Sequence, residues 1–193
     1  MIKKIRNYNA GMTYVELIVV LSIFSVMTSI ALFDYNKFQA KVDIKVLANE
    51  IALKIVEAQK FAMSGKIPIQ NISSTWKPSY GIYFDLVDNK NFIYFANTID
   101  GSNNSYDDTS CNLPPTVGGG ECLDYIHIKK DNFIKDLKCS GNPINNLTIV
   151  FRRPNSGALM SCFGDVEIIV SSPGTNPVTA NIKVYPSGRI QIN

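Results

Sequence analysis

The pattern of apolar and polar positions changes three times along the chain, and the first change follows a short polar start. From Leu17 to Phe33 no side chain carries a charge, and the polar ones are four hydroxyls. Counted from Met12 to Phe33 the apolar run has 22 residues, and a helix of that length measures roughly 33 Å, about the hydrocarbon thickness of a bilayer. The pattern therefore predicts a transmembrane helix.

The second change is to a one-sided pattern. Residues 35 to 64 contain neither Pro nor Gly, and apolar residues recur at steps of three or four, as on one face of a helix. These residues are Leu47, Ile51, Ile55, Ala58 and Ala62. Gly65 and Pro68 follow, which is typical of a helix end. Because nothing interrupts the two patterns, we expect one helix from Met12 to Ser64, apolar all round at first and amphipathic afterwards.

The third pattern, from residue 67 onwards, is typical of β-structure. Segments rich in β-branched and aromatic residues alternate with turn residues. The predicted strands are 80–86, 91–97, 124–130, 146–153, 165–172, 180–186 and 188–193, with turns at 88–91, 154–157 and 186–188. The polar loop 100–121 is too long for a plain connector. The expected fold class is α+β, with a long N-terminal α-helix (transmembrane first half, amphipathic second half) packed on a C-terminal antiparallel β-sheet head.

Charge is distributed unevenly at the start of the chain. Lys and Arg number 19 against 16 Asp and Glu, and without the first eleven residues the two counts are equal. Such a balance argues against bulk polyanion binding, which needs clustered cations. Because Lys3, Lys4 and Arg6 precede the apolar run, the positive-inside rule predicts a single-pass inner-membrane protein with an extracytoplasmic head.

Four cysteines follow the apolar run and suggest two disulfides, since an extracytoplasmic environment oxidises thiols. Three connectivities are possible. We expect the sequential pairing, which closes the shortest loops: Cys111 with Cys122 and Cys139 with Cys162. A zinc site is the weaker interpretation, because no CxxC pair exists and the only histidine, His127, lies in a strand pattern.

Glu16 is the unusual residue of the apolar segment. A carboxylate near a membrane core costs on the order of 2.5 to 3.5 kcal/mol, so such a residue indicates a function. No Lys or Arg lies between Gly11 and Tyr35. We therefore expect its partner to come from another chain, or from an amine produced by processing of the N-terminus.

The segment "AGMTYVELIVVLSIF" resembles the class III leader and N-terminal helix of type IV pilins and type II secretion pseudopilins. The resemblance implies that a prepilin peptidase cuts after Gly11 and that Met12 becomes the N-methylated first residue. It also implies that Glu16 is the glutamate at the fifth mature position. That carboxylate could pair with the Met12 ammonium of a neighbouring subunit during assembly.

The resemblance extends to GspH/FimT-like minor pilins. Residues 46–67 are similar to the second helical half of these proteins, and "WKPSYGIYFD", "LTIVFRRPNSG" and "VYPSGRIQIN" follow in the order of their β head. Met12 and Phe33 depart from the family, where Phe and Pro are frequent. The implied organisation is a leader (1–11), a filament-core helix (12–33), an amphipathic helix half (34–66) and a β-rich head (67–193).

The implied function is a structural subunit of a pilus or a type II secretion pseudopilus. Its implied partners are other pilins in a filament, the prepilin peptidase that is also an N-methyltransferase, and the inner-membrane assembly platform. Two simpler interpretations are a secretory signal peptide cut near Ser29-Ile30-Ala31 and a plain anchor in which Glu16 reaches the membrane surface. The first leaves Gly11 and Glu16 unexplained.

The loop 100–108 offers oxygen ligands for Ca²⁺ in Asp100, Asn103, Asn104, Asp107 and Asp108. Their spacing differs from an EF-hand, so solvated loop acids are the favoured interpretation and no cofactor is expected. The chain also lacks GxSxG, Walker and HExxH motifs, so we expect no enzyme.

A competing hypothesis is a DNA receptor in natural transformation, because some FimT-like pilins capture DNA through arginines two apart after a glycine. Here the segment reads Gly188-Arg189-Ile190-Gln191, so half of that motif is present. The candidate DNA-binding residues are Arg189, Lys183, Arg152 and Arg153.

Overall fold

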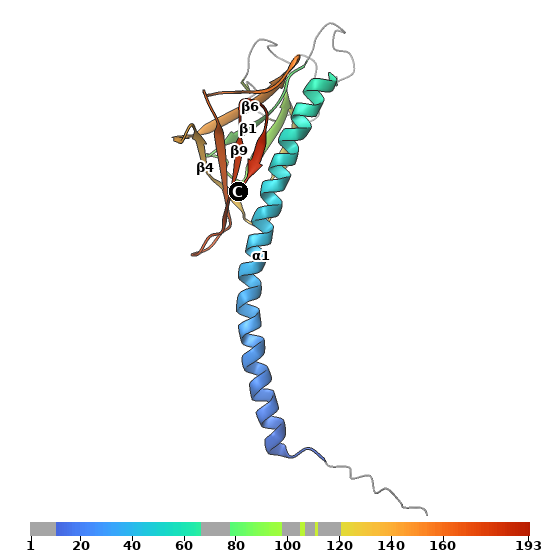
Figure 1. Ribbon diagram of the computed structural model, residues 1–193, viewed down its shortest axis with the longest axis vertical. Helices are drawn as coiled ribbons and strands as arrows, with labels where there is room; N and C mark the ends of the chain where they lie inside the picture. Colours follow the sequence, from blue (N-terminus) through green and yellow to red (C-terminus); the bar gives the residue numbers. More distant parts are fainter. Residues whose placement is uncertain (1–10, 67–77, 98–104, 107–110, 112–120) are drawn as a thin grey trace, which may run out of the picture. The chain divides into compact units, whose positions relative to one another are not determined.

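The computed structural model describes residues 11–66, 78–97, 105–106, 111 and 121–193; within the helix, the side chains of residues 31–34 and 36 are not described. The chain forms one long helix and then strands (Figure 1). The elements are α1 (Tyr14–Ser64), β1 (Tyr80–Asp85), β2 (Asn91–Ala96), β3 (Cys122–His127), β4 (Phe133–Cys139), β5 (Asn142–Ile144), β6 (Asn146–Arg152), β7 (Asn155–Met160), β8 (Val166–Ser171), β9 (Thr179–Val184) and β10 (Ile190–Ile192). The chain divides into two compact units, and the boundary lies within α1. The N-terminal unit extends to Gln39, and the C-terminal unit begins at Ala40.

Both ends of α1 have specific caps. The Thr13 hydroxyl oxygen accepts from the Glu16 N–H at 3.3 Å, and the Glu16 carboxylate accepts from the Thr13 N–H at 3.5 Å. This reciprocal arrangement is a capping box. At the other end Gly65 adopts φ +62°, the left-handed conformation that ends many helices.

The strands form two five-stranded antiparallel sheets. Sheet A has the order β3-β2-β1-β6-β7, and sheet B has the order β10-β9-β8-β4-β5. In the part of the chain that the structure describes, backbone hydrogen bonds join the sheets at three places. They run from Leu86 N–H to Asn145 O at 2.9 Å, from Ala158 N–H to Pro186 O at 3.0 Å, and from Ile134 N–H to Asn89 O at 2.8 Å. The sheets therefore enclose a shared interior.

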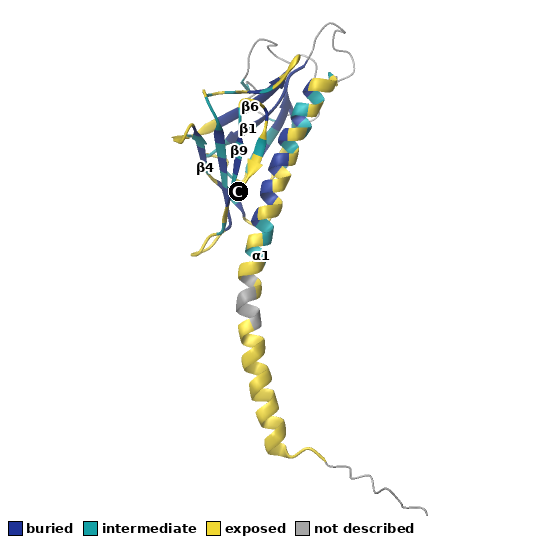
Figure 2. Cartoon of the chain, viewed as in Figure 1, coloured by how far each residue is buried: buried dark blue, intermediate teal, exposed yellow. Residues whose placement is uncertain are grey.

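The C-terminal part of α1 fills this interior with one of its faces (Figure 2). The predicted apolar face is confirmed, since Leu47, Ile51, Ile55, Ala58 and Ala62 are all buried. They pack in one cluster with residues of both sheets, among them Phe84 and Ile149 from sheet A and Ile168 and Ile182 from sheet B. Burial of this stripe is what holds the helix to the sheets.

The expected fold class needs correction. The expectation combined a transmembrane helix half with one antiparallel sheet, whereas the C-terminal unit is built mainly from two sheets. In the part of the chain that the structure describes, no helix combines the length and apolarity that crossing a membrane requires. The expected localisation as a single-pass inner-membrane protein is contradicted by the same finding, that no helix in the described part of the chain is long and apolar enough to cross a membrane.

Three strands were not predicted. β4 reads FIKDLKC, and its pairing with β8 shifts register between Ile134 and Asp136, so the bulge removes the simple alternation. β5 has three residues and includes Pro143. The predicted turn at 154–157 is wrong beyond its first residue, because β7 begins at Asn155. β7 was not predicted because it lacks β-branched residues, which are the main sequence signal of a strand.

Candidate functional site

The most distinctive surface of the chain is a second apolar face on α1. Within the C-terminal unit Val46, Leu53, Val56 and Met63 are exposed, with Leu53 at 69 %. Together with the exposed Asn49 and Lys60 they recur at alternating steps of three and four, the heptad spacing of a helix that packs against another helix. We call Val46, Asn49, Leu53, Val56, Lys60 and Met63 the outer stripe.

Charged residues border the outer stripe. Lys45 precedes its first member and Glu50 follows Asn49, and both are exposed. In heptad terms they occupy the flanking positions whose side chains reach the partner helix in a parallel pair. In a parallel pair, Lys45 of one helix would lie close to Glu50 of the other, and their opposite charges would attract. These two flanking residues therefore favour a parallel neighbouring helix over an antiparallel one.

The N-terminal unit presents the same kind of surface. Its described apolar side chains are exposed on every side of the helix. They include Val15, Leu17, Ile18, Val19, Val20, Leu21, Ile23, Phe24, Val26, Met27 and Ile30. Contiguous apolar surface of this extent is rare on a protein that works alone and marks a contact surface.

The processing and assembly residues lie at the start of this unit. Gly11 and Met12 are exposed and precede the helix, and Glu16 lies in its first turn. The expectation that the Glu16 partner must come from elsewhere is incomplete, because the Thr13 N–H already donates to this carboxylate. The sequence Thr13-x-x-Glu16 carries the capping-box signature, which could have revealed this contact. Residues 1–10 lie outside the described part of the chain.

The cysteines form the two expected disulfides, Cys111–Cys122 and Cys139–Cys162. Their Cα atoms lie 5.0 and 6.4 Å apart, respectively, within the range that a disulfide spans. The second bond connects the end of β4 in sheet B with the residues that follow β7 in sheet A. It therefore links the two sheets covalently.

The four candidate DNA-binding residues have different local partners. Lys183 makes ion pairs with Asp165 at 2.7 Å and Glu167 at 3.2 Å. Arg153 donates from Nε to the Met63 carbonyl at 2.8 Å, and Arg189 stacks on the Tyr185 ring at 4.2 Å from its centroid. Arg152 is exposed at the end of β6. Since Lys183 is neutralised and Arg153 caps the helix, the four do not act as one free cationic patch.

His127 belongs to a polar network on the surface of sheet A. Its Nδ1 lies 2.8 Å from Asn91 Oδ1, and Asn91 Nδ2 donates to Asp88 at 2.5 Å. The Tyr125 hydroxyl also donates to Asp88, and this bond raises the pKa of Tyr125. The contacts agree with the structural role expected for His127. In the residues that the structure describes, no group of three or more His, Cys, Asp or Glu side chains could hold a metal.

The calcium ligands suggested by the sequence, Asp100, Asn103, Asn104, Asp107 and Asp108, lie outside the described residues. No Ca²⁺ site is therefore assigned to this loop.

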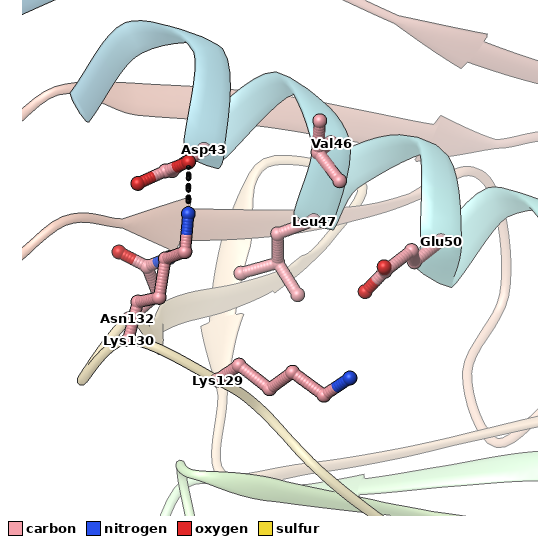
Figure 3. Close-up of a pocket in the computed structure, with 7 residues that line it drawn as sticks. All are labelled: Asp43, Val46, Leu47, Glu50, Lys129, Lys130 and Asn132. Carbon is pink, nitrogen blue, oxygen red and sulfur yellow. Dashed lines mark hydrogen bonds and ion pairs between the residues drawn. The ribbon is translucent and has the colours of Figure 1, made fainter. Parts of the chain in front are cut away.

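A small cavity marks the contact between α1 and the turn after β3 (Figure 3). It measures about 90 Å³ and is lined by Asp43, Val46, Leu47, Glu50, Lys129, Lys130 and Asn132. The Lys130 ammonium points to Asp43 on the helix and lies 2.7 Å from its carboxylate. Lys130 and Asp131 adopt φ of 61° and 54°, a conformation that turns the chain tightly here. The ion pair between Lys130 and Asp43 holds the helix to this turn. The cavity itself is too small for most ligands.

A larger cavity, about 260 Å³, lies beside Tyr80, Tyr94 and Phe61. Burial raises the pKa of Tyr80 to about 12, and burial together with nearby Glu57 raises that of Tyr94 further. The ring faces are already occupied, because Lys54 lies over Tyr94 and Lys66 lies over Phe61. The cavity therefore lacks a free aromatic platform for a ligand.

Comparison with known proteins adds no relative: no protein family, curated protein or solved structure matches this chain. The interpretation of its function therefore depends on the residues and geometry described above.

Proposed function

We propose that the chain is a structural subunit of a filament, of the type IV pilin and type II secretion pseudopilin class and GspH/FimT-like within it. The observation that carries this proposal is the outer stripe. In the C-terminal unit α1 has two apolar faces, and the sheets cover one of them. A helix with apolar residues on two sides needs a second packing partner to remove the remaining apolar surface from water.

The occupant that we propose for the outer stripe is the α1 helix of a neighbouring subunit. Its heptad spacing suits packing between helices, and the bordering Lys45 and Glu50 supply opposite charges to a parallel neighbour. The exposed apolar residues of the N-terminal unit also need a packing partner that removes them from water. Repeated helix-on-helix packing of identical or similar subunits produces a filament rather than a closed complex when the rotation does not close.

Processing at Gly11 is part of this proposal. It would place a new amine at Met12, one turn before Glu16, whose carboxylate has accepting capacity beyond its contact with the Thr13 N–H. A neighbouring Met12 ammonium would then bind Glu16 and fix the register between helices. The peptidase that cuts after Gly11 and other pilins are the proposed partners, and catalysis has no part in this function.

The outer stripe is tested with a charge placed at its centre. Leu53→Lys in the full chain should weaken self-association at least tenfold, measured as the dissociation constant by analytical ultracentrifugation. The control is Val87→Lys, which changes an exposed apolar residue in the turn between β1 and β2 and should leave the constant within about twofold. Equal effects of the two substitutions would contradict the role of the stripe.

The filament class is tested separately by the intact mass of the protein purified from its own cells. A polypeptide that starts at Met12 and carries one added methyl group would support the proposal. A polypeptide that starts at any other position would remove the proposed amine from the reach of Glu16.

DNA capture is the weaker alternative. Lys183 is paired with two carboxylates and Arg153 is bound to the helix end, which leaves Arg152 and Arg189 as the candidates with accessible charge. Two cations supply little of the counterion release that drives DNA affinity. We therefore do not propose DNA as a partner.

A further inference from the structure

We propose that Lys60 sets the register between the α1 helices of two neighbouring copies and holds them displaced by one heptad along the helix axis. The inference rests on the proposed filament role, because it takes the outer stripe as a contact between copies. It adds which alignment of the two helices the stripe allows. This alignment is specified within the C-terminal unit, independently of the proposed contact between Met12 and Glu16.

Lys60 is the charged residue of the outer stripe, and its ammonium has no partner in the part of the chain that the structure describes. The residue is exposed and makes no ion pair there. The nearest carboxylate along α1 belongs to Glu57, three residues earlier, and it is bound to the Lys54 ammonium at 3.1 Å. An ammonium that enters an apolar contact without a partner needs a polar group on the other helix.

The heptad spacing fixes what Lys60 meets across a parallel contact. Like Val46 and Leu53, Lys60 is followed by a member of the outer stripe three residues later, which makes it an a position. Each a side chain inserts into a hole formed by four residues of the facing helix. These four residues are neighbours on the helix surface, at steps of three and four. Displacement of one helix by whole heptads keeps the two stripes facing each other and changes only which residues form the hole.

Two copies in register would bring their Lys60 ammonium groups together. The hole around Lys60 would consist of four residues of the other copy, namely Val56, Gln59, Lys60 and Met63. Like charges that face each other in a contact from which water is excluded repel, and both lose hydration. A displacement by two heptads meets the same obstacle, because the hole then includes Lys45. Both alignments are therefore disfavoured.

A displacement by one heptad gives Lys60 a hole without a cation. The hole then consists of four residues of the displaced copy, namely Asn49, Ala52, Leu53 and Val56. Asn49 is suited to receive the ammonium, because its Nδ2 donates to its own Lys45 carbonyl at 2.8 Å and its Oδ1 has no donor among the described residues. Lys60 of the displaced copy lies beyond Ser64, where α1 of the other copy has ended, so it faces no residue of that helix.

The charges around this hole are balanced. Those of the displaced copy that border it are two of each sign, on Lys45, Glu50, Lys54 and Glu57. The displacement also retains opposite charges at the flanking positions. Lys45 of the displaced copy comes next to Glu57 of the other copy instead of Glu50, and Lys45 of that copy comes next to Asp43. The preference for a parallel neighbour is therefore kept.

The register is tested by photo-crosslinking from the centre of the outer stripe in the full chain. Leu53 is replaced by benzoylphenylalanine, and isotope-labelled and unlabelled copies are mixed so that mass spectrometry recognises crosslinks between copies. Displacement by one heptad should give crosslinks to residues 42–46 and 59–63 of the other copy at least fivefold more often than to residues 52–53, which position 53 meets in register.

Lys60→Leu removes the repulsion between the two ammonium groups and should raise the share of crosslinks to residues 52–53 at least fivefold. The matched control is Lys41→Leu, which makes the same change at an exposed lysine of α1 outside the outer stripe and should leave the crosslinks as in wild type. Wild-type crosslinks mainly to residues 52–53, or no change with Lys60→Leu, would overturn the role of Lys60 and leave the filament proposal standing. Absence of crosslinks between copies from position 53 would overturn the outer-stripe contact itself, and with it both proposals.

Discussion

At the scale of single residues, Lys183 shows how a local partner changes the meaning of a charge. It lies on β9 and makes ion pairs with two carboxylates, Asp165 just before β8 and Glu167 within β8. The hydrogen bond to Asp165 and then that to Glu167 raise the pKa of Lys183 to about 12, and the same contact with Lys183 lowers the pKa of Asp165. A residue that suggested DNA binding in the sequence therefore holds two strands together.

This pair predicts a pH window for stability. The lowered pKa of Asp165 stabilises the fold above the ordinary value of 3.8, and this contribution is lost as the pH falls through the folded pKa. The raised pKa of Lys183 stabilises it below the ordinary value of 10.5, and this contribution is lost as the pH rises through about 12. We expect the difference in melting temperature between wild type and Lys183→Met to be constant from about pH 5 to 9 and to shrink below about pH 4. A difference that grows in acid would contradict this assignment.

At the scale of elements, α1 is defined by its two apolar faces and by its ends. The inner face was predictable because its spacing is regular and its residues are strongly apolar. The outer stripe is interrupted by Asn49 and Lys60, so its heptad spacing became clear only when the exposed residues were separated from the buried ones. The capping box at Thr13 and Glu16 follows from the Thr-x-x-Glu spacing, which is present in the sequence.

The C-terminal end of α1 gives a prediction at this scale. Arg153, from the residues that connect β6 with β7, donates to the carbonyl of Met63 in the last turn of the helix. Arg153→Ala should lower the free energy of unfolding by about 1 kcal/mol, because a charge-assisted hydrogen bond at an exposed helix end is lost. Arg152→Ala is the control, and its effect should stay within about 0.5 kcal/mol. Urea denaturation measures both, and equal losses would show that Arg153 does not act through the helix end.

At the scale of the whole molecule, the C-terminal unit depends on links between its sheets. In the described part of the chain, three backbone hydrogen bonds and one disulfide connect sheet A with sheet B, and one face of α1 packs against residues of both sheets. The other disulfide, Cys111–Cys122, ties β3 to its preceding loop. The two bonds therefore contribute to different parts of the unit.

Removal of the bond between the sheets should have a large effect. The Cys139→Ala/Cys162→Ala variant opens a loop with a sequence separation of 23 residues, and the chain-entropy estimate for such a loop is about 3 kcal/mol of unfolding free energy. The corresponding double variant of Cys111 and Cys122, with a separation of 11, should lose roughly 0.5 kcal/mol less. Guanidinium denaturation under non-reducing conditions compares the two variants with wild type. An unchanged midpoint for the first variant would indicate that the backbone hydrogen bonds and the packing of α1 hold the sheets together without the disulfide.

The sequence by itself determined the features that depend on neighbours in the chain. Periodicity is a local property, so the helix with its buried Leu47, Ile51 and Ile55 and the strands with clear alternation could be predicted. The sequence left three disulfide connectivities open. The sequential pairing was expected because it closes the shortest loops, and the tertiary structure decided among the three. The tertiary structure decided what depends on distant partners: the division into two sheets, the bulged strand β4 and the ion pairs of Lys183 with Asp165 and Glu167. These features result from contacts between segments far apart in the chain, whose free energy does not appear in any local pattern.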